Sequence, residues 1–276
     1  MTLVLLLGIG AYAAYRHFTP YLIGEGCQAD TSGQAIPLDA EQAGIAATIA
    51  GVAVKDEVPR GAVTVAYATA MQESHLHDLD YGDQDSVGVF QQRPSQGWGT
   101  TKQLEDPVYA TTKFFTALLQ VRGYLGMPVY EAAQAVQHSA DGTAYMQYEQ
   151  LATGLSGAFT GASPRAVWCW YPPDPPRAPD LGSASRALTR TFGSVRVDRT
   201  ATSGPAPVAP AASQPAAAVR VRHRPTGWAV ASWLVTHAKA YGISDVRYAG
   251  YRWNASAGDH GWTRDAAAPS SRVELG

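Results

Sequence analysis

Apolar residues recur at helical spacing in the first half of the chain. Ile45, Ile49 and Val52 fall on one face of a helix expected over residues 40–55. A second helix is expected from about 61 to 74, where apolar residues lie on nearly all sides. A helix that is apolar all round is buried. The pattern therefore predicts a helical core built early in the chain.

Weaker patterns predict the later elements. A helix is expected over 107–122 and a shorter one over 130–139. Residues 183–198 read as a helix followed by a short strand. Alternating residues at 245–248 and 273–275 predict two strands close to the C-terminus. The chain as a whole is expected to be mainly α.

Composition shifts divide the chain. An apolar segment at 1–23 is followed by a Gly/Ser/Thr-rich stretch at 24–37, which reads as a tether or loop. Residues 38–170 are expected to form the main folded domain. Proline and alanine dominate 171–225, which is typical of a linker, and 226–276 is expected to be a small α/β module.

One carboxylate stands out against this background. Glu73 is placed in the last turn of an apolar helix, and a polar loop containing Gly88 follows it. A carboxylic acid that is held still and half buried beside a cleft can act as a general acid on a glycosidic bond. Glu73 is therefore the candidate catalytic residue.

The spacing of this motif resembles that of a known family. The motif begins with Glu73-Ser74, continues through about a dozen residues of irregular chain, and ends with Ser86-Val87-Gly88-Val89-Phe90-Gln91. This arrangement resembles that of the soluble lytic transglycosylases and goose-type lysozymes. The resemblance covers roughly residues 38–160. It implies a lysozyme-like α+β domain that acts on peptidoglycan, with Glu73 as catalytic acid. It also implies a substrate cleft, for which the candidate lining residues are Ser86, Gly88, Gln91, Gln92, Trp98 and Gln137.

The chain departs from this family at one element. Where the family has Tyr-Asn-Ala-Gly, this sequence reads Ala135-Val136-Gln137-His138-Ser139. Gln137 is the candidate for the polar role there, and Tyr145 or Tyr148 are candidates to reach the cleft from the next helix. Trp98, which lies between two glycines, is either a face for a sugar ring or a core residue.

Two reaction types remain open for such a site. In a lytic transglycosylase Glu73 acts alone, and the N-acetyl group of the sugar stabilises the cationic carbon. An inverting muramidase needs a second carboxylate about 6.5–9.5 Å away, and Asp83 and Asp85 are the candidates. A non-catalytic protein that binds the cell wall is the alternative from a different class.

The net charge and the spacing of possible metal ligands limit the kinds of partner that the protein is expected to bind. The net charge of −2 and the lack of a long basic run argue against nucleic acid. No metal-ligand spacing is complete, so neither a metal nor another cofactor is expected. We expect a monomer whose partners are peptidoglycan and, through the N-terminal segment, the membrane.

The N-terminal segment and the cysteines bear on location. The apolar run from Leu3 to Tyr15 is a membrane anchor, a signal peptide cut after Ala11-Tyr12-Ala13, or a buried helix of a soluble protein. The first two alternatives place the rest of the chain at the outer face of the membrane, in the cell wall or in the medium. Cys27 and Cys169 are then expected to form a disulfide, with two free buried thiols as the alternative.

The last segment is rich in tryptophan. Two roles are open for Trp233, Trp253 and Trp262: they bind wall polymer, or they build a small hydrophobic core. The second interpretation is favoured, because a short module needs large side chains to form a core at all.

Overall fold

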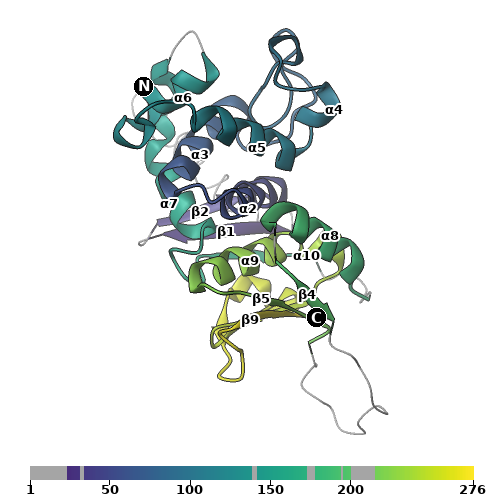
Figure 1. Cartoon of the computed structure of the whole chain (residues 1–276). Coiled ribbons are helices and arrows are strands. Elements are labelled where there is room, and N and C mark those ends of the chain that lie inside the picture. The colour runs from purple at the N-terminus through teal and green to yellow at the C-terminus, as the bar shows by residue number, and fades with distance from the viewer. Residues whose placement is uncertain (1–23, 32–33, 139–141, 173–177, 194, 200–214) are drawn as a thin grey trace, which may run out of the picture.

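The structure is a computed structural model that describes residues 24–31, 34–138, 142–172, 178–193, 195–199 and 215–276 (Figure 1). The expected anchor or signal segment, 1–23, lies outside the described residues. Among the described helices, none combines the length and the apolar character needed to cross a membrane.

Helices make up the part of the molecule that contains Glu73. A capping box at Asp39 and Gln42 starts α2, where the Asp39 carboxylate accepts the Gln42 N–H and the Gln42 side chain accepts the Asp39 N–H. Both predicted early helices are confirmed within one residue at each end. The helices of this part are α2 (Ala40–Lys55), α3 (Arg60–Ser74), α4 (Thr101–Leu104), α5 (Pro107–Leu118), α6 (Val129–Gln137) and α7 (Glu149–Phe159), with 3₁₀ turns η1 (Pro94–Gln96), η2 (Tyr124–Gly126) and η3 (Gly142–Tyr148).

A small antiparallel sheet lies beside these helices. Its strand order is β2 (Gln34–Leu38), β1 (Gly26–Thr31), β3 (Val167–Trp170). Cys27 and Cys169 face each other in the β1–β3 register and are joined by a disulfide. The disulfide expected from the sequence is thus confirmed, and it joins positions 142 residues apart. A disulfide is weakly consistent with a location outside the reducing cytoplasm.

The rest of the chain builds a second, larger sheet. Its six strands are all antiparallel, in the order β4-β5-β9-β6-β7-β8. The elements of this part are α8 (Leu181–Phe192), β4 (Val197–Arg199), β5 (Ala217–Arg220), α9 (Arg224–Thr236), α10 (Ala238–Tyr241), β6 (Asp245–Tyr248), β7 (Tyr251–Asn254), η4 (Ala255–His260), β8 (Thr263–Arg264) and β9 (Arg272–Leu275).

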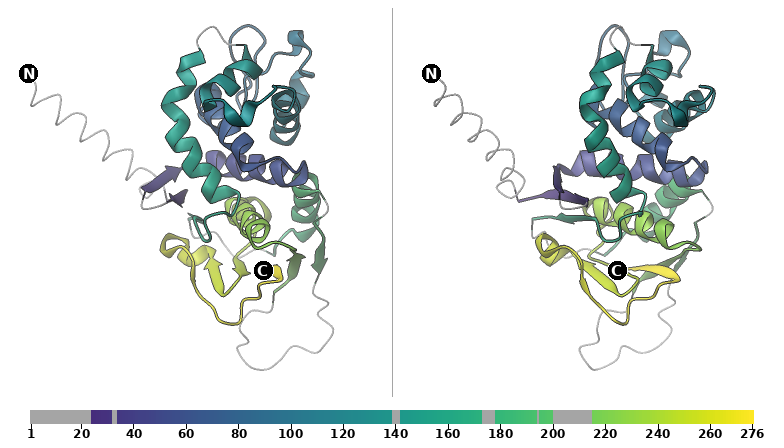
Figure 2. Two further views of the ribbon diagram at one scale, coloured as in Figure 1. Left: turned by 60° about the vertical axis from the view of Figure 1, so that its left-hand side comes forward. Right: turned by 90° about the vertical axis from the view of Figure 1, so that its left-hand side faces the viewer.

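The two parts are packed against each other through α2 and α9. Helix α9 lies between α2 on one side and strands β6 and β9 on the other, and α8 also packs against α2 (Figure 2). Trp233 of α9 is 1% exposed and Trp253 of β7 is 0% exposed. These two tryptophans are core residues, as favoured from the sequence, whereas Trp262 is only partly buried.

The expectation of a mainly α fold is wrong. Antiparallel sheets of three and six strands make a substantial part of the molecule. Residues 24–37, expected to be a tether or loop, contain β1 and β2, and the range 171–225, expected to be a linker, contains α8, β4 and β5 among its described residues. The strands predicted at 245–248 and 273–275 match β6 and β9, whereas nothing in the local pattern predicted β1, β2 and β5. Their extended conformation is set by pairing partners far away in the chain.

Candidate functional site

Glu73 lies in the last turn of α3, where it is half buried. The helix ends because the next two residues, His75 (φ 54°) and Leu76 (φ 61°), adopt left-handed backbone conformations. The N–H of Leu76 donates to the carbonyl of Ala70 at 3.1 Å, which closes the helix end. Leu76 is fully buried beneath this turn. The turn therefore fixes the end of the helix that carries Glu73.

Ser74 ties this helix end to the glycine-containing loop. Its hydroxyl is buried and contacts the carbonyl oxygens of Ala70, at 3.1 Å, and Val89, at 2.8 Å. Val89 belongs to the element that resembles the transglycosylase motif. The two halves of the motif are thus in direct contact.

A tyrosine holds the Glu73 carboxylate. The hydroxyl of Tyr145 donates a hydrogen bond to Oε1 of Glu73 over 2.6 Å, and Tyr145 is only 1% exposed. Tyr145 lies on η3, which runs alongside the end of α3. A second contact fixes the same pair of elements, since Nε2 of Gln147 donates to Oε1 of Gln72 at 3.1 Å. Of the two tyrosines considered from the sequence, Tyr145 contacts Glu73, whereas Tyr148 contacts His75 at 3.2 Å.

The loop after α3 forms a tight turn at Gly88. Backbone N–H groups of Val87 and Gln92 donate to each other's carbonyls at 3.1 Å, and Gly88 has a φ of 76°. A Cβ at position 88 would lie 2.2 Å from the carbonyl oxygen of Leu104, so both backbone angle and space require glycine. The loop that follows Glu73 therefore contains a tight turn at Gly88.

The candidate cleft residues have different surroundings. Gln91 is half buried and its Nε2 donates to the carbonyls of Gly88 and Tyr81, both at 3.2 Å. Gln92 instead points into the protein, where its Nε2 contacts the carbonyl of Ala110 at 3.4 Å and only 2% of its surface is exposed. Of this pair, only Gln91 is partly exposed.

The remaining candidates support the loop. Gln137, at the end of α6, donates from Nε2 to the carbonyl of Phe90 at 2.7 Å. Ser86 is 7% exposed and donates its N–H to the carbonyl of Asp83 at 3.0 Å. Trp98 is partly buried and packs against the hydrophobic core. These residues shape the loop, and the contacts of Gln137 and Ser86 are with backbone.

The two candidate second carboxylates differ in their contacts. Asp85 accepts hydrogen bonds from Nε of Arg93 at 3.0 Å and from the N–H and hydroxyl of Ser95 at 2.7 and 2.9 Å. The Arg93 hydrogen bond, followed by those from Ser95, lowers the pKa of Asp85 to about 2. A carboxylate with three donors and so low a pKa is a weak base. Asp83, in contrast, is exposed.

Asp78 was missing from the candidates and has the most unusual environment in this loop. Partial burial, together with the nearby charges of Glu105, Glu41 and Asp80, raises the pKa of Asp78 to about 6. Its Oδ1 is buried and accepts no hydrogen bond from the described residues. The sequence shows four aspartates in this loop, but it does not show which of them is brought close to Glu41 and Glu105 by folding.

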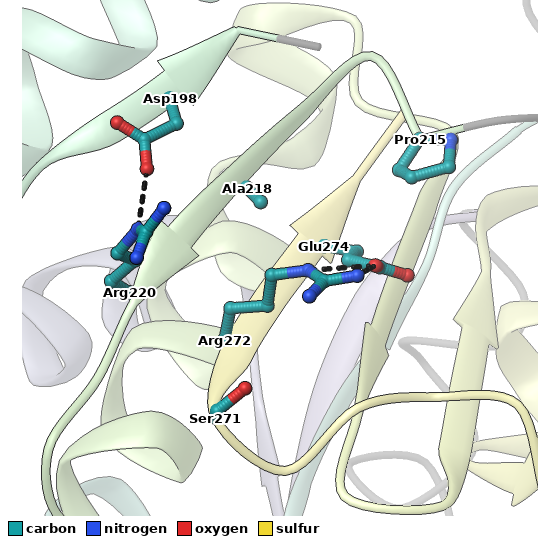
Figure 3. Close-up of a pocket in the computed structure, with 7 residues that line it drawn as sticks. All are labelled: Asp198, Pro215, Ala218, Arg220, Ser271, Arg272 and Glu274. Atoms are coloured by element: carbon teal, nitrogen blue, oxygen red, sulfur yellow. Dashed lines mark hydrogen bonds and ion pairs between the residues drawn. The ribbon is translucent and has the colours of Figure 1, made fainter.

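Two cavities lie elsewhere in the described structure. One, of about 340 Å³, lies on the outer face of the six-stranded sheet (Figure 3). There Nε of Arg220 lies 2.8 Å from Asp198, and Nη2 of Arg272 lies 2.7 Å from Glu274, so these charges are already paired. The other lies between the two sheets. Glu73 lines neither of them.

A scan against protein-family models finds no match for this chain, and a search of curated proteins finds no significantly similar sequence.

Proposed function

We propose that the protein cleaves the β-1,4 bond between N-acetylmuramic acid and N-acetylglucosamine in peptidoglycan, as a lytic transglycosylase. The observation that carries the proposal is the contact between Tyr145 and the half-buried Glu73, beside the turn at Gly88. A carboxylic acid that is half buried and held in one orientation can act as a general acid on a glycosidic bond.

In this reaction Glu73 first donates its proton to the oxygen of the glycosidic bond, which breaks. The N-acetyl group of the muramic acid stabilises the positive carbon C1. The Glu73 carboxylate then removes the proton of the C6 hydroxyl, whose oxygen bonds to C1 and gives the 1,6-anhydro product. Tyr145 donates a hydrogen bond to the carboxylate that forms when Glu73 loses its proton. Charge that develops in the transition state is best stabilised by a donor already in place.

Lytic transglycosylation is favoured over hydrolysis by the state of Asp85. An inverting hydrolase needs a free carboxylate to activate water. Asp85 is held by Arg93 and Ser95, and its low pKa makes it a poor base. Asp83 remains as the candidate base for the hydrolytic alternative. The proposed site of action is the cell wall or the outer face of the membrane, a location with which the disulfide is consistent.

The test is product analysis of digested cell wall by mass spectrometry. The wild-type protein is expected to release fragments with 1,6-anhydro ends, and Glu73→Gln is expected to release none. Glu41→Gln is the matched control, because the Glu41 side chain accepts a backbone N–H from Asp78 through Oε1, which glutamine retains. If the wild-type protein releases fragments with reducing ends and Asp83→Asn releases none, the protein is instead a hydrolase. Unchanged activity of Glu73→Gln would refute the assignment of the acid.

A further inference from the structure

The cavity between the two sheets is lined by residues from both parts of the chain. We call it the seam pocket. Its volume is about 410 Å³, within the range of small-molecule sites, roughly 300–1,000 Å³. The residues that define it are Asp30 of β1, Ser163 and Arg165 from the segment before β3, Trp168 of β3, and His260 and Trp262 at and after the end of η4.

Close contacts between the two parts of the chain fix the shape of the seam pocket. The indole Nε1 of Trp262 donates to the carbonyl of Val167 at 2.7 Å, and that of Trp253 donates to the carbonyl of Cys169 at 2.9 Å. At Gly258 the backbones approach so closely that a Cβ would lie 2.1 Å from the Cys169 carbonyl oxygen. The pocket is therefore built into the fold, and a ligand can enter it without ordering its walls first.

Two partly exposed indoles give the pocket its aromatic surface. Trp168 and Trp262 are both partly buried. Gly261, which has a φ of 65°, lies against Trp168, and a Cβ there would be 3.3 Å from the indole ring. Trp262 is braced by the buried Trp228, with the ring centroids 5.2 Å apart. Both indoles are held by their neighbours and offer flat apolar surface at fixed positions.

The polar groups of the pocket carry both signs of charge. Asp30 and Arg165 are exposed, and neither has an ion-pair partner among the described residues. The Arg165 guanidinium lies over the ring of Tyr251, 4.3 Å from its centroid, which leaves its edge for hydrogen bonding. His260 pairs with Asp259 at 3.0 Å. The pocket thus offers one unpaired carboxylate and one unpaired guanidinium.

We propose that the seam pocket binds a saccharide, namely an N-acetylated amino-sugar segment of a glycan strand. Indole surface suits the apolar faces of sugar rings, and a carboxylate and a guanidinium can each bind two neighbouring polar groups. The opposite charges of Asp30 and Arg165 favour a neutral, polar ligand over a phosphate, which the carboxylate would repel. The choice of amino sugar rests on the proposed function. The pocket would hold the wall polymer at a place separate from Glu73.

The test uses full-length Glu73→Gln protein labelled with ¹⁵N and titrated with the tetramer of N-acetylglucosamine. The indole N–H resonances of Trp168 and Trp262 report on the seam pocket, and that of Trp98 reports on the segment that follows the turn at Gly88. We expect shifts at Trp168 and Trp262. The double variant Asp30→Ala/Arg165→Gly is expected to bind at least tenfold more weakly, because two polar partners are lost.

The variants are chosen so that a loss of binding at the seam pocket can be separated from a loss of the fold. Arg165 has a φ of 62°, which glycine adopts without cost, so the double variant is expected to fold and to keep the indole spectrum of the ligand-free protein. Arg220→Ala, in the other cavity, is expected to bind the tetramer unchanged. Shifts confined to Trp98, or equal binding by the double variant, would overturn the proposal. Shifts at the pocket with a sugar-free stem peptide but not with the tetramer would also overturn it. Failure of the proposed function would appear separately, as missing anhydro products with the pocket titration intact.

Discussion

Removal of one hydroxyl group tests the role assigned to Tyr145. Tyr145→Phe keeps the ring, which is 1% exposed, and deletes the 2.6 Å hydrogen bond to Oε1 of Glu73. Hydrogen bonds to charged groups contribute about 1.5–3 kcal/mol. The bond is strongest when Glu73 carries negative charge, which it acquires as it gives up its proton. Because about 1.4 kcal/mol corresponds to a tenfold change, we expect the rate to fall roughly ten- to a hundredfold.

The assay is the initial rate of clearing of a peptidoglycan suspension, with the free energy of unfolding measured on the same samples in urea. Tyr148→Phe is the matched control, since it lies on the same 3₁₀ turn and its hydroxyl contacts His75 rather than Glu73. It is expected to keep the wild-type rate within about twofold. A wild-type rate for folded Tyr145→Phe, or an equal loss in Tyr148→Phe, would refute the reasoning.

Three further predictions concern stability. Replacement of both Cys27 and Cys169 by alanine is expected to lower the free energy of unfolding by up to about 5 kcal/mol, because the disulfide closes a long loop. A decrease of less than about 1 kcal/mol in urea titrations would contradict this expectation. Gly88→Ala is expected to lower the free energy of unfolding by about 2–5 kcal/mol, because position 88 has a positive φ and the new Cβ would meet the Leu104 carbonyl. The variant is also expected to lose the clearing of cell wall. An unchanged free energy of unfolding would show that the loop adapts to the extra methyl group. The pKa of Asp78 is raised in the folded protein from 3.8 to about 6, so the folded state binds the proton more tightly and stability falls as the pH rises through this window. Asp78→Asn should flatten that slope in unfolding measurements between pH 4 and 6.

Helices with a strong periodic pattern were predictable from the sequence. The spacing of Ile45, Ile49 and Val52 located α2, and the apolar run before Glu73 located α3. Glu73 could therefore be placed in a last helical turn before the fold was known. These predictions succeed because a helix is specified by contacts within one short segment.

Strand β1 and parts of the site depend on distant contacts. β1 is extended because it pairs with β2 and with β3, more than a hundred residues later, and nothing local in 24–37 indicates this. For the same reason the sequence could not select Tyr145 over Tyr148, or show that Gln92 points inward while Gln91 does not. The seam pocket combines Asp30 with Trp262, a pair that only the folded chain brings together.

Helix α2 connects these distant parts. The side chain of Gln42 donates to the carbonyl of His75 at 2.9 Å, in the turn directly after Glu73. Elsewhere on the same helix, Gly44 lies against His237 of the turn between α9 and α10, where a Cβ would be 3.7 Å from the imidazole ring. One helix therefore supports the turn that ends α3 and also packs on α9, which covers the larger sheet. The sheet and α9 thus contribute to the rigidity of the Glu73 site, because α2 cannot shift at one of these contacts without disturbing the other.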